Sequence, residues 1–169
     1  MLLRDLGEWE LLRRLAAYAP PGQLEDDAAV LPPGSAPLVI NTDLLVEGVH
    51  FSDATMGPAD AGWRAAAANL SDLAAMGCGP VVGLTVGLVA PADTPWAWVE
   101  GVYDGLSDAL RHHGGRLLGG DCSSGNQRLL AITALGHIAS GPIRRGDGHA
   151  GDWLVSTGPH GLKIGRAHV

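Results

Sequence analysis

Apolar residues recur along this chain with two periods, one typical of helices and one typical of strands. The helical period, bounded by proline and glycine, predicts helices over Gly7–Tyr18, Pro58–Met76 and Pro95–His113. Short apolar runs predict strands over Asp27–Leu31, Leu38–Thr42, Val46–Phe51, Val82–Val89, Arg116–Gly119, Leu129–Ile138 and Trp153–Ser156, with a turn over Gly120–Gly125. Because helices separate pairs of strands, we expect an α+β fold, a mixed sheet flanked by helices, rather than a doubly wound sheet.

The composition is that of a globular protein with a sizeable core, since 46% of the 169 residues are hydrophobic and 17% are charged. A formal net charge of −7 argues against a nucleic-acid surface, because phosphate backbones are bound by clustered Lys and Arg. Apolar stretches such as Val81–Ala90 fall short of the roughly 20 residues of a membrane-spanning helix. Acidic residues interrupt the start of the chain, where a signal peptide would be apolar. We therefore expect a cytoplasmic protein with no nucleic-acid or membrane partner.

Cysteine and histidine form no pattern typical of zinc sites or disulfides. Cys78 and Cys122 have no CxxC spacing, and the seven His form no HExxH arrangement. We interpret both Cys as buried or incidental thiols.

The acids are biased toward aspartate, with thirteen Asp against five Glu. Four Asp stand beside predicted strands or inside an apolar helix, where a core would not place an acid. They are Asp27 before Ala28–Leu31, Asp43 after Val39–Thr42, Asp72 within Ala65–Met76, and Asp121 after Leu117–Gly120. Any one of them is explained as a cap, a turn residue or a surface acid. Together they are harder to explain that way.

Several carboxylates brought together repel one another unless a cation neutralises them. Oxygen ligands without a His or Cys cluster favour Mg²⁺, which is usually completed by water and substrate phosphates. The sequence has no GxxxxGK[ST] loop, so phosphates would be held through metal. We expect the side chains of Asp27, Asp43, Asp72 and Asp121 to lie within about 10 Å of a common point.

Three blocks carry a family resemblance. They are Asn41–Phe51 (NTDLLVEGVHF), Ala68–Gly77 (ANLSDLAAMG) and Gly119-Gly120-Asp121. In order and spacing they resemble the signatures of thiamine-monophosphate kinases, and the resemblance extends from Leu6 to about Gly158. It implies the N-terminal domain shared with aminoimidazole ribonucleotide synthetase, in which strands of two subunits build a barrel. A homodimer and a second, C-terminal domain are therefore implied.

The same resemblance implies roles for individual residues. Magnesium-binding positions match Asp27, Thr42, Asp43, Asp72 and Asp121, with Asn41 also near metal; of these, Asp43, Asp72 and Asp121 are the expected catalytic acids. Contact with thiamine phosphate is implied for His50, and ATP binding for Gly120, Asp121 and Arg145. Two departures, Glu25 for the usual Gly and Cys122 for the usual Thr, affect loop geometry rather than a carboxylate. Without the resemblance, His50 reads as a half-buried strand-end residue and Arg145 as a loop charge.

The implied reaction is the in-line transfer of the γ-phosphoryl group of ATP to thiamine phosphate, giving thiamine diphosphate, with Mg²⁺ ions and ATP as co-substrate. Another ATP-dependent enzyme of the superfamily is an alternative: aminoimidazole ribonucleotide synthetase, selenophosphate synthetase or a hydrogenase-maturation factor. Selenophosphate synthetases carry a reactive Cys or selenocysteine near the N-terminus, and residues 1–77 contain no Cys. A further alternative is an inactive nucleotide- or metal-binding fragment.

We predict three parts of the chain. Residues 1–150 form the N-terminal ATP- and magnesium-binding domain, and 151–163 begin a truncated C-terminal domain. Residues 164–169, Ile-Gly-Arg-Ala-His-Val, correspond to one reading frame of a common sequencing adapter and are expected to be a non-native tail.

Overall fold

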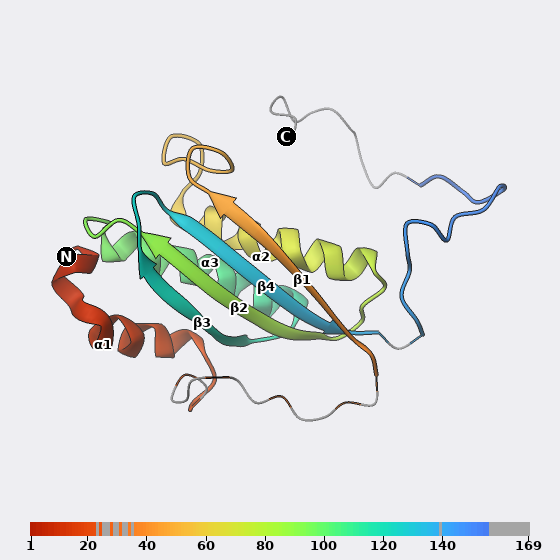
Figure 1. Ribbon diagram of the computed structural model, residues 1–169, viewed down its shortest axis with the longest axis horizontal. Helices are drawn as coiled ribbons and strands as arrows, with labels where there is room; N and C mark the ends of the chain where they lie inside the picture. Colours follow the sequence, from red (N-terminus) through yellow and green to blue (C-terminus); the bar gives the residue numbers. More distant parts are fainter. Residues whose placement is uncertain are drawn as a thin grey trace.

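The computed structural model describes residues 1–22, 24, 28, 31, 34, 36–138 and 140–155, and it confirms the α+β class (Figure 1). The helices are α1 (Leu3–Leu15), the short 3₁₀ helix η1 (Ala16–Tyr18), α2 (Pro58–Ala75) and α3 (Trp96–His113). The strands are β1 (Leu38–Val46), β2 (Val81–Ala90), β3 (Leu117–Ser124) and β4 (Leu129–His137). None of the described helices is long and apolar enough to cross a membrane.

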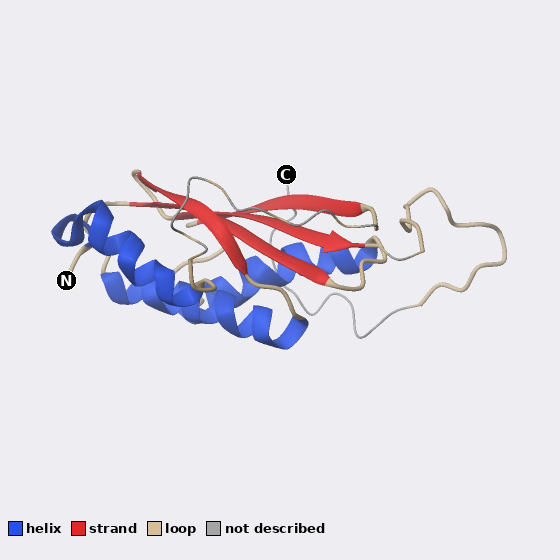
Figure 2. Cartoon of the chain, turned by 90° about the horizontal axis from the view of Figure 1, so that it is seen from below, coloured by secondary structure: helices blue, strands red, loops and turns tan. Residues whose placement is uncertain are grey.

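The four strands form one mixed sheet in the order β1-β4-β2-β3. Strand β4 runs antiparallel to both β1 and β2, whereas β2 and β3 are parallel. The parallel pair needs a crossover connection, and α3 supplies it. Helices α2 and α3 lie together against one face of the sheet (Figure 2).

The core lies between this face and the two helices. Alternate residues of the central strands are buried toward the helices: Leu84, Val86, Leu88, Leu130, Ile132 and Ala134. Helices α2 and α3 approach closely because glycine stands at their contact. A Cβ at Gly62 would lie 1.9 Å from the Val102 carbonyl oxygen, and one at Gly105 would lie 1.9 Å from that of Ala59. No larger residue fits either position without moving a helix.

The opposite face of the sheet is different, because no described helix covers it (Figure 2). Leu38, Ile40 and Leu44 of β1 project from this face and are exposed. Strands β1 and β3 are the two edges of the sheet, so each has one side without a described strand partner. We call this surface the open face.

The three predicted helices are confirmed, with one change at the N-terminus. Helix α1 begins at Leu3 rather than Gly7, and Gly7 forms a kink within it at φ +69°. That positive φ is accessible to glycine and is not helical, so the kink at Gly7 separates a first turn at residues 3–6 from the rest of α1.

Several strand predictions are wrong. Strand β1 does not end at Thr42 but continues to Val46, and the predicted strand Val46–Phe51 is mostly a turn, with Gly48 at φ +77°. The predicted turn Gly120–Gly125 belongs largely to β3, because pairing with β2 continues to Ser124. Trp153–Val155 are exposed and form no strand. The predicted strand 27–31, apart from Ala28 and Leu31, and the tail 156–169 lie outside the described residues.

Candidate functional site

Polar side chains gather where β1 passes over α2. Asn41 and Asp43 lie on the helix-facing side of β1, because alternate residues of a strand share a face. Below them, Asn69 of α2 is fully buried, and its Nδ2 donates to the Ala65 carbonyl oxygen at 2.9 Å. Its Oδ1 accepts hydrogen bonds from the Asp43 backbone N–H at 3.1 Å and from Asn41 Nδ2 at 3.2 Å. A buried amide therefore ties the edge strand to the helix.

Asp72 joins this group from the next turn of α2, since Asn41 Nδ2 also donates to Asp72 Oδ2 at 3.3 Å. The Asn41 Oδ1 atom is buried and accepts no hydrogen bond from the described residues. An unsatisfied amide oxygen near the Asp72 carboxylate, on the same side of β1 as Asp43, is the type of ligand set that Mg²⁺ takes. The residues of this group, Asn41, Asp43, Asn69 and Asp72, therefore fit a hard cation, and we call them the β1–α2 acid group.

Two further predicted metal ligands, Thr42 and Asp121, do not join this group. Thr42 follows Asn41 and so points to the open face, where its Oγ1 lies 2.7 Å from Thr133 Oγ1. Asp121 also points to the open face. It pairs with Gly87 of β2, which lies between the helix-facing residues Val86 and Leu88. Asp27 lies outside the described residues.

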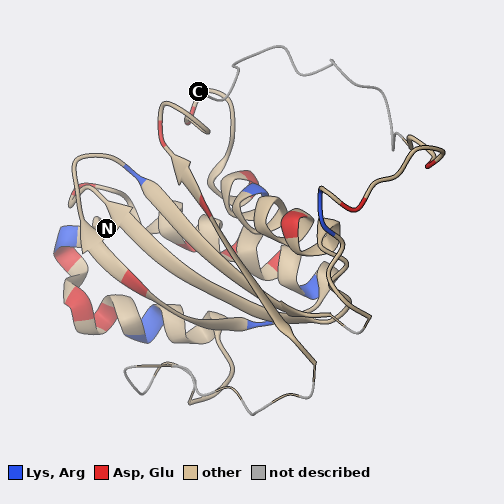
Figure 3. Ribbon diagram, turned by 45° about the vertical axis from the view of Figure 1, so that its right-hand side comes forward, with Lys and Arg blue, Asp and Glu red and all other residues tan. Residues whose placement is uncertain are grey.

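Asp43 and Asp121 are thus at opposite edges and on opposite faces of the sheet. Acidic positions are seen on the ribbons of strands at both sides of the sheet (Figure 3). Three strand spacings of about 4.8 Å separate the edges by about 14 Å. Among the described residues, no three His, Cys, Asp or Glu side chains come close enough to hold a metal ion. The expectation that four aspartates meet at one point is therefore wrong for Asp121 within a single chain.

His50 lies just after β1, in the turn that leads to α2. Its Nδ1 accepts a hydrogen bond from the Val46 backbone N–H at 3.0 Å, so the neutral ring carries its proton on Nε2. Arg64 of α2 donates to the His50 carbonyl oxygen at 2.5 Å. Arg64 and Asp72 are eight residues apart on one helix, which corresponds to about 12 Å along its axis. His50 therefore lies at the opposite end of α2 from Asp72.

A cavity of about 590 Å³ lies along β3. Its lining residues come from α1, α3, the segment before β1 and the β3 residues 117–122, with Thr85 of β2 and Leu135 of β4. Packing within the sheet requires glycine at position 120, because a Cβ there would lie 2.0 Å from the Val86 carbonyl oxygen. Gly119 is different: a Cβ on it would meet no atom within 4 Å, and its φ is not positive. The backbone at Gly119 is therefore open to a molecule in the cavity.

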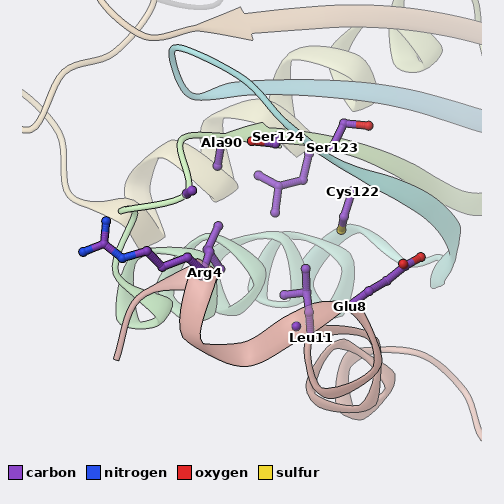
Figure 4. Close-up of a pocket in the computed structure, with 11 residues that line it drawn as sticks. Arg4, Glu8, Leu11, Ala90, Cys122, Ser123 and Ser124 are labelled. Carbon is purple, nitrogen blue, oxygen red and sulfur yellow. The ribbon is translucent and has the colours of Figure 1, made fainter.

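A second cavity of about 300 Å³ lies between the start of α1 and the ends of β2 and β3. Figure 4 shows Leu11 and the Cys122 sulfur pointing into it, while the charged ends of Arg4 and Glu8 turn away from its centre. Burial, and then the charges of Asp121 and Glu8, raise the pKa of Cys122 to about 11. The thiol is therefore protonated at neutral pH and is a poor nucleophile.

Arg145, predicted to bind ATP, lies in the exposed segment after β4. The backbone N–H of Ile143 donates to the Met76 carbonyl oxygen at 3.0 Å, which brings this segment to the C-terminal end of α2. Arg145 is thus nearer in the fold to the end of α2 that carries Asp72 than to the end that approaches His50.

One residue of the site, Asn69, had no role in our reading of the sequence. It lies in the block Ala68–Gly77 and is the one fully buried polar residue of α2. Its position three residues before Asp72, on an otherwise apolar helix face, is the sequence feature that could have predicted a role beside Asp72. A buried asparagine needs hydrogen-bond partners, and those partners are here the backbone and side chains of β1.

Comparison with known proteins identifies the family. The family model described as AIR synthase related protein, N-terminal domain, matches residues 25–138. Since this is more than half of the chain, the chain belongs to that family.

Individual relatives of this chain include thiamine-monophosphate kinases. A thiamine-monophosphate kinase of Prochlorococcus marinus is 53% identical over 161 residues, which cover 95% of this chain and 48% of the relative. The crystal structure of thiamine-monophosphate kinase from Stenotrophomonas maltophilia K279a is 36% identical, with a TM-score of 0.68 over 83% of this chain and 45% of that one. A structure of AaThiL complexed with AMPPCP and TMP is 30% identical, with a TM-score of 0.58 over 80% and 43%. The chain spans about half the length of the relatives it matches.

Proposed function

We propose that the full-length gene product containing this chain is a thiamine-monophosphate kinase, which transfers the γ-phosphoryl group of ATP to thiamine phosphate. The observation that carries the proposal is the β1–α2 acid group, with the unsatisfied oxygen of Asn41 beside Asp43 and Asp72. The family membership and the AaThiL complex with an ATP analogue and TMP support it. Residues 1–150 are the N-terminal domain on this proposal, and a second domain follows.

The acid group has a definite task in such a reaction. Mg²⁺ bound there would neutralise the negative charge of the phosphate groups. The protein's own contribution is position: Asn69 fixes the backbone of Asp43 and the amide of Asn41, so the oxygens do not need to be reorganised during the reaction. His50, at the other end of α2, would orient thiamine phosphate. The acceptor is already an anion, so no strong general base is required.

The 590 Å³ cavity along β3 is the proposed nucleotide site. Its volume lies in the range of ordinary ligand pockets. Gly119 gives a ligand access to the backbone, and Gly120 and Asp121 are the positions that match ATP-binding residues of the family. Tyr103 and Leu118 supply an apolar wall. Arg145 would add positive charge from the segment after β4.

A homodimer would bring the edge that carries Asp43 next to the edge that carries Asp121. The open face carries exposed Leu38, Ile40 and Leu44, and neither edge strand has a second strand partner among the described residues. We propose a homodimer in which β1 of one chain lies beside β3 of the other, so that two sheets close into one barrel. The partner chain's β3 would then carry its Asp121 to the edge where Thr42 and Asp43 lie. Two such composite sites form per dimer.

The test of the kinase function is ADP release by the full-length gene product with Mg²⁺ and ATP. We expect release with thiamine phosphate and almost none with thiamine, which lacks the acceptor phosphate. Thiamine diphosphate should form in equal amount to ADP. Equal ADP release with and without thiamine phosphate would contradict the proposal. Turnover only with substrates of aminoimidazole ribonucleotide synthetase or of a hydrogenase-maturation factor would favour those alternatives.

A further inference from the structure

An ion-pair cluster centred on a buried arginine includes both ends of the segment that carries His50. Arg128, just before β4, is almost fully buried and donates through Nη2 to Glu47 Oε1 and, at 2.9 Å, to Asp53 Oδ2. Its backbone N–H donates to Glu47 Oε2 at 3.1 Å, and its carbonyl oxygen accepts from the Glu47 N–H at 3.0 Å. One arginine therefore holds both ends of residues 47–53.

Aromatic rings complete the environment of this arginine. The Arg128 guanidinium lies 4.7 Å from the centroid of the Trp98 ring and 6.0 Å from that of Phe51, and the two rings stack at 5.9 Å. A planar guanidinium suits such a place because it stacks on rings while pairing with carboxylates. The hydrogen bond from Arg128 lowers the pKa of Glu47, so the pair stays ionised at neutral pH.

The conformation between the two anchors determines where His50 lies. Gly48 N–H donates to the Phe51 carbonyl oxygen at 2.8 Å, and His50 N–H donates to that of Val46 at 2.8 Å. The imidazole is then held by the Val46 N–H, and the peptide carbonyl by Arg64. Moving either end of 47–53 would therefore move the ring.

We propose that Arg128 is a positioning residue for the phosphate acceptor, acting through Glu47 and Asp53 on the turn that presents His50. It rests on the proposed kinase function, because it assumes that His50 faces thiamine phosphate. Arg128 makes no contact with the β1–α2 acid group in the described structure, so its effect is on acceptor binding and not on the nucleotide.

The test compares Arg128→Met with the parent in the full-length gene product. Methionine keeps much of the apolar stem and removes the charge. We expect the KM for thiamine phosphate to rise about tenfold and the KM for ATP to stay within about twofold. Arg128→Lys should recover part of the loss, since it keeps the charge but not the two-pronged pairing. The matched control is Arg111→Met, which removes an exposed pair with Asp108 and should change neither KM.

A double-mutant cycle separates positioning from general destabilisation. In a His50→Ala background, Arg128→Met should have little further effect on the KM for thiamine phosphate, because both changes act through one contact. Equal effects in both backgrounds, or equal changes in the two KM values, would overturn the proposal. If Arg128→Met fails to fold, Glu47→Gln, at a more exposed partner, is measured in the same cycle.

Hydrogen exchange distinguishes this proposal from the kinase function. Without substrates, Arg128→Met should speed exchange of the Gly48 and His50 amides at least tenfold relative to those of β2. Unchanged exchange overturns the role of Arg128 even in an active kinase. A parent enzyme that does not phosphorylate thiamine phosphate overturns the kinase function and, with it, the acceptor role.

Discussion

The two edges of the sheet carry the predicted site in contrasting ways. At β1 the polar groups are tied to α2 by hydrogen bonds through Asn69, so the acids have fixed places before any ligand binds. At β3 the backbone borders a cavity, and Gly119 faces open space. The first edge is pre-organised for a small cation, whereas the second leaves room for a larger molecule. On the proposed function each edge would supply part of the site for phosphoryl transfer, and the two edges lie apart in one chain.

The largest effect is expected at β1, from Asp43→Asn. This change keeps the shape and removes a charge, so thiamine diphosphate formation at saturating Mg²⁺ should fall by about 10³-fold. A melting curve without metal should show an intact fold, because lost repulsion between the acids offsets a weakened hydrogen bond. Asp93→Asn, at an exposed turn, is the control and should retain activity. Turnover within a few-fold of the parent would show that Asp43 is not a metal ligand.

The second largest effect is expected from loss of the hydrogen bonds by which Asn69 holds β1 in place. Asn69→Ala leaves the Asp43 N–H without its acceptor and removes one of the acceptors of the Asn41 amide, which should lower the free energy of unfolding by about 1–3 kcal/mol. Urea unfolding of the variant and of Ser71→Ala, an exposed neighbour on α2, measures the difference. An unchanged midpoint in Asn69→Ala would mean that water replaces the amide and that the edge is not tied to the helix.

At β3 two neighbouring glycines should behave differently. Gly120→Ala places a Cβ against the Val86 carbonyl oxygen and should cost about 1–3 kcal/mol of stability. Gly119→Ala meets open space, so stability should stay the same while the KM for ATP rises several-fold. Thermal melts and ATP titrations of both variants test this. The cavity is not the nucleotide site if Gly119→Ala leaves the KM for ATP unchanged.

The smallest effect is chemical and concerns Cys122. Because the pKa of its thiol is raised to about 11, its alkylation by iodoacetamide should be slow at pH 7.5 and should increase about tenfold per pH unit up to pH 10. Mg²⁺ and ATP should slow the reaction, since Cys122 also lines the 590 Å³ cavity. Mass spectrometry of the Cys122 peptide measures both. A rate that levels off near pH 8 would contradict the raised pKa.

The sequence predicted the helices and the central strands well, because their periodic segments are long and are bounded by proline or glycine. It failed where polar residues lie inside an edge strand. Asn41 and Asp43 read as a strand end, yet they face α2 and their strand continues. Gly120 likewise was predicted to begin a turn, although it lies within β3 and is required to be glycine by the close backbone of β2.

The site residues also divide into those that the sequence predicted and those that it did not. The acids were singled out by their unusual neighbours, and Asn41 links two of them to one region, since its Nδ2 contacts Asp72 and it shares the helix-facing side of β1 with Asp43. The position of Asp121 was not predictable, because the face and edge that it occupies depend on the strand order β1-β4-β2-β3. Arg128 was also missed, since its partners Glu47 and Asp53 are 75 residues or more away in the sequence.

The composite site is tested most directly by combining two inactive variants of the full-length gene product. Asp43→Asn and Asp121→Asn subunits, carrying different affinity tags, are co-expressed, and the mixed dimers are isolated. Each mixed dimer has one site with both aspartates and one with neither, so we predict about half of the parent's turnover, although each variant alone is nearly inactive. Mixed dimers as inactive as the separate variants would contradict a site shared between two chains.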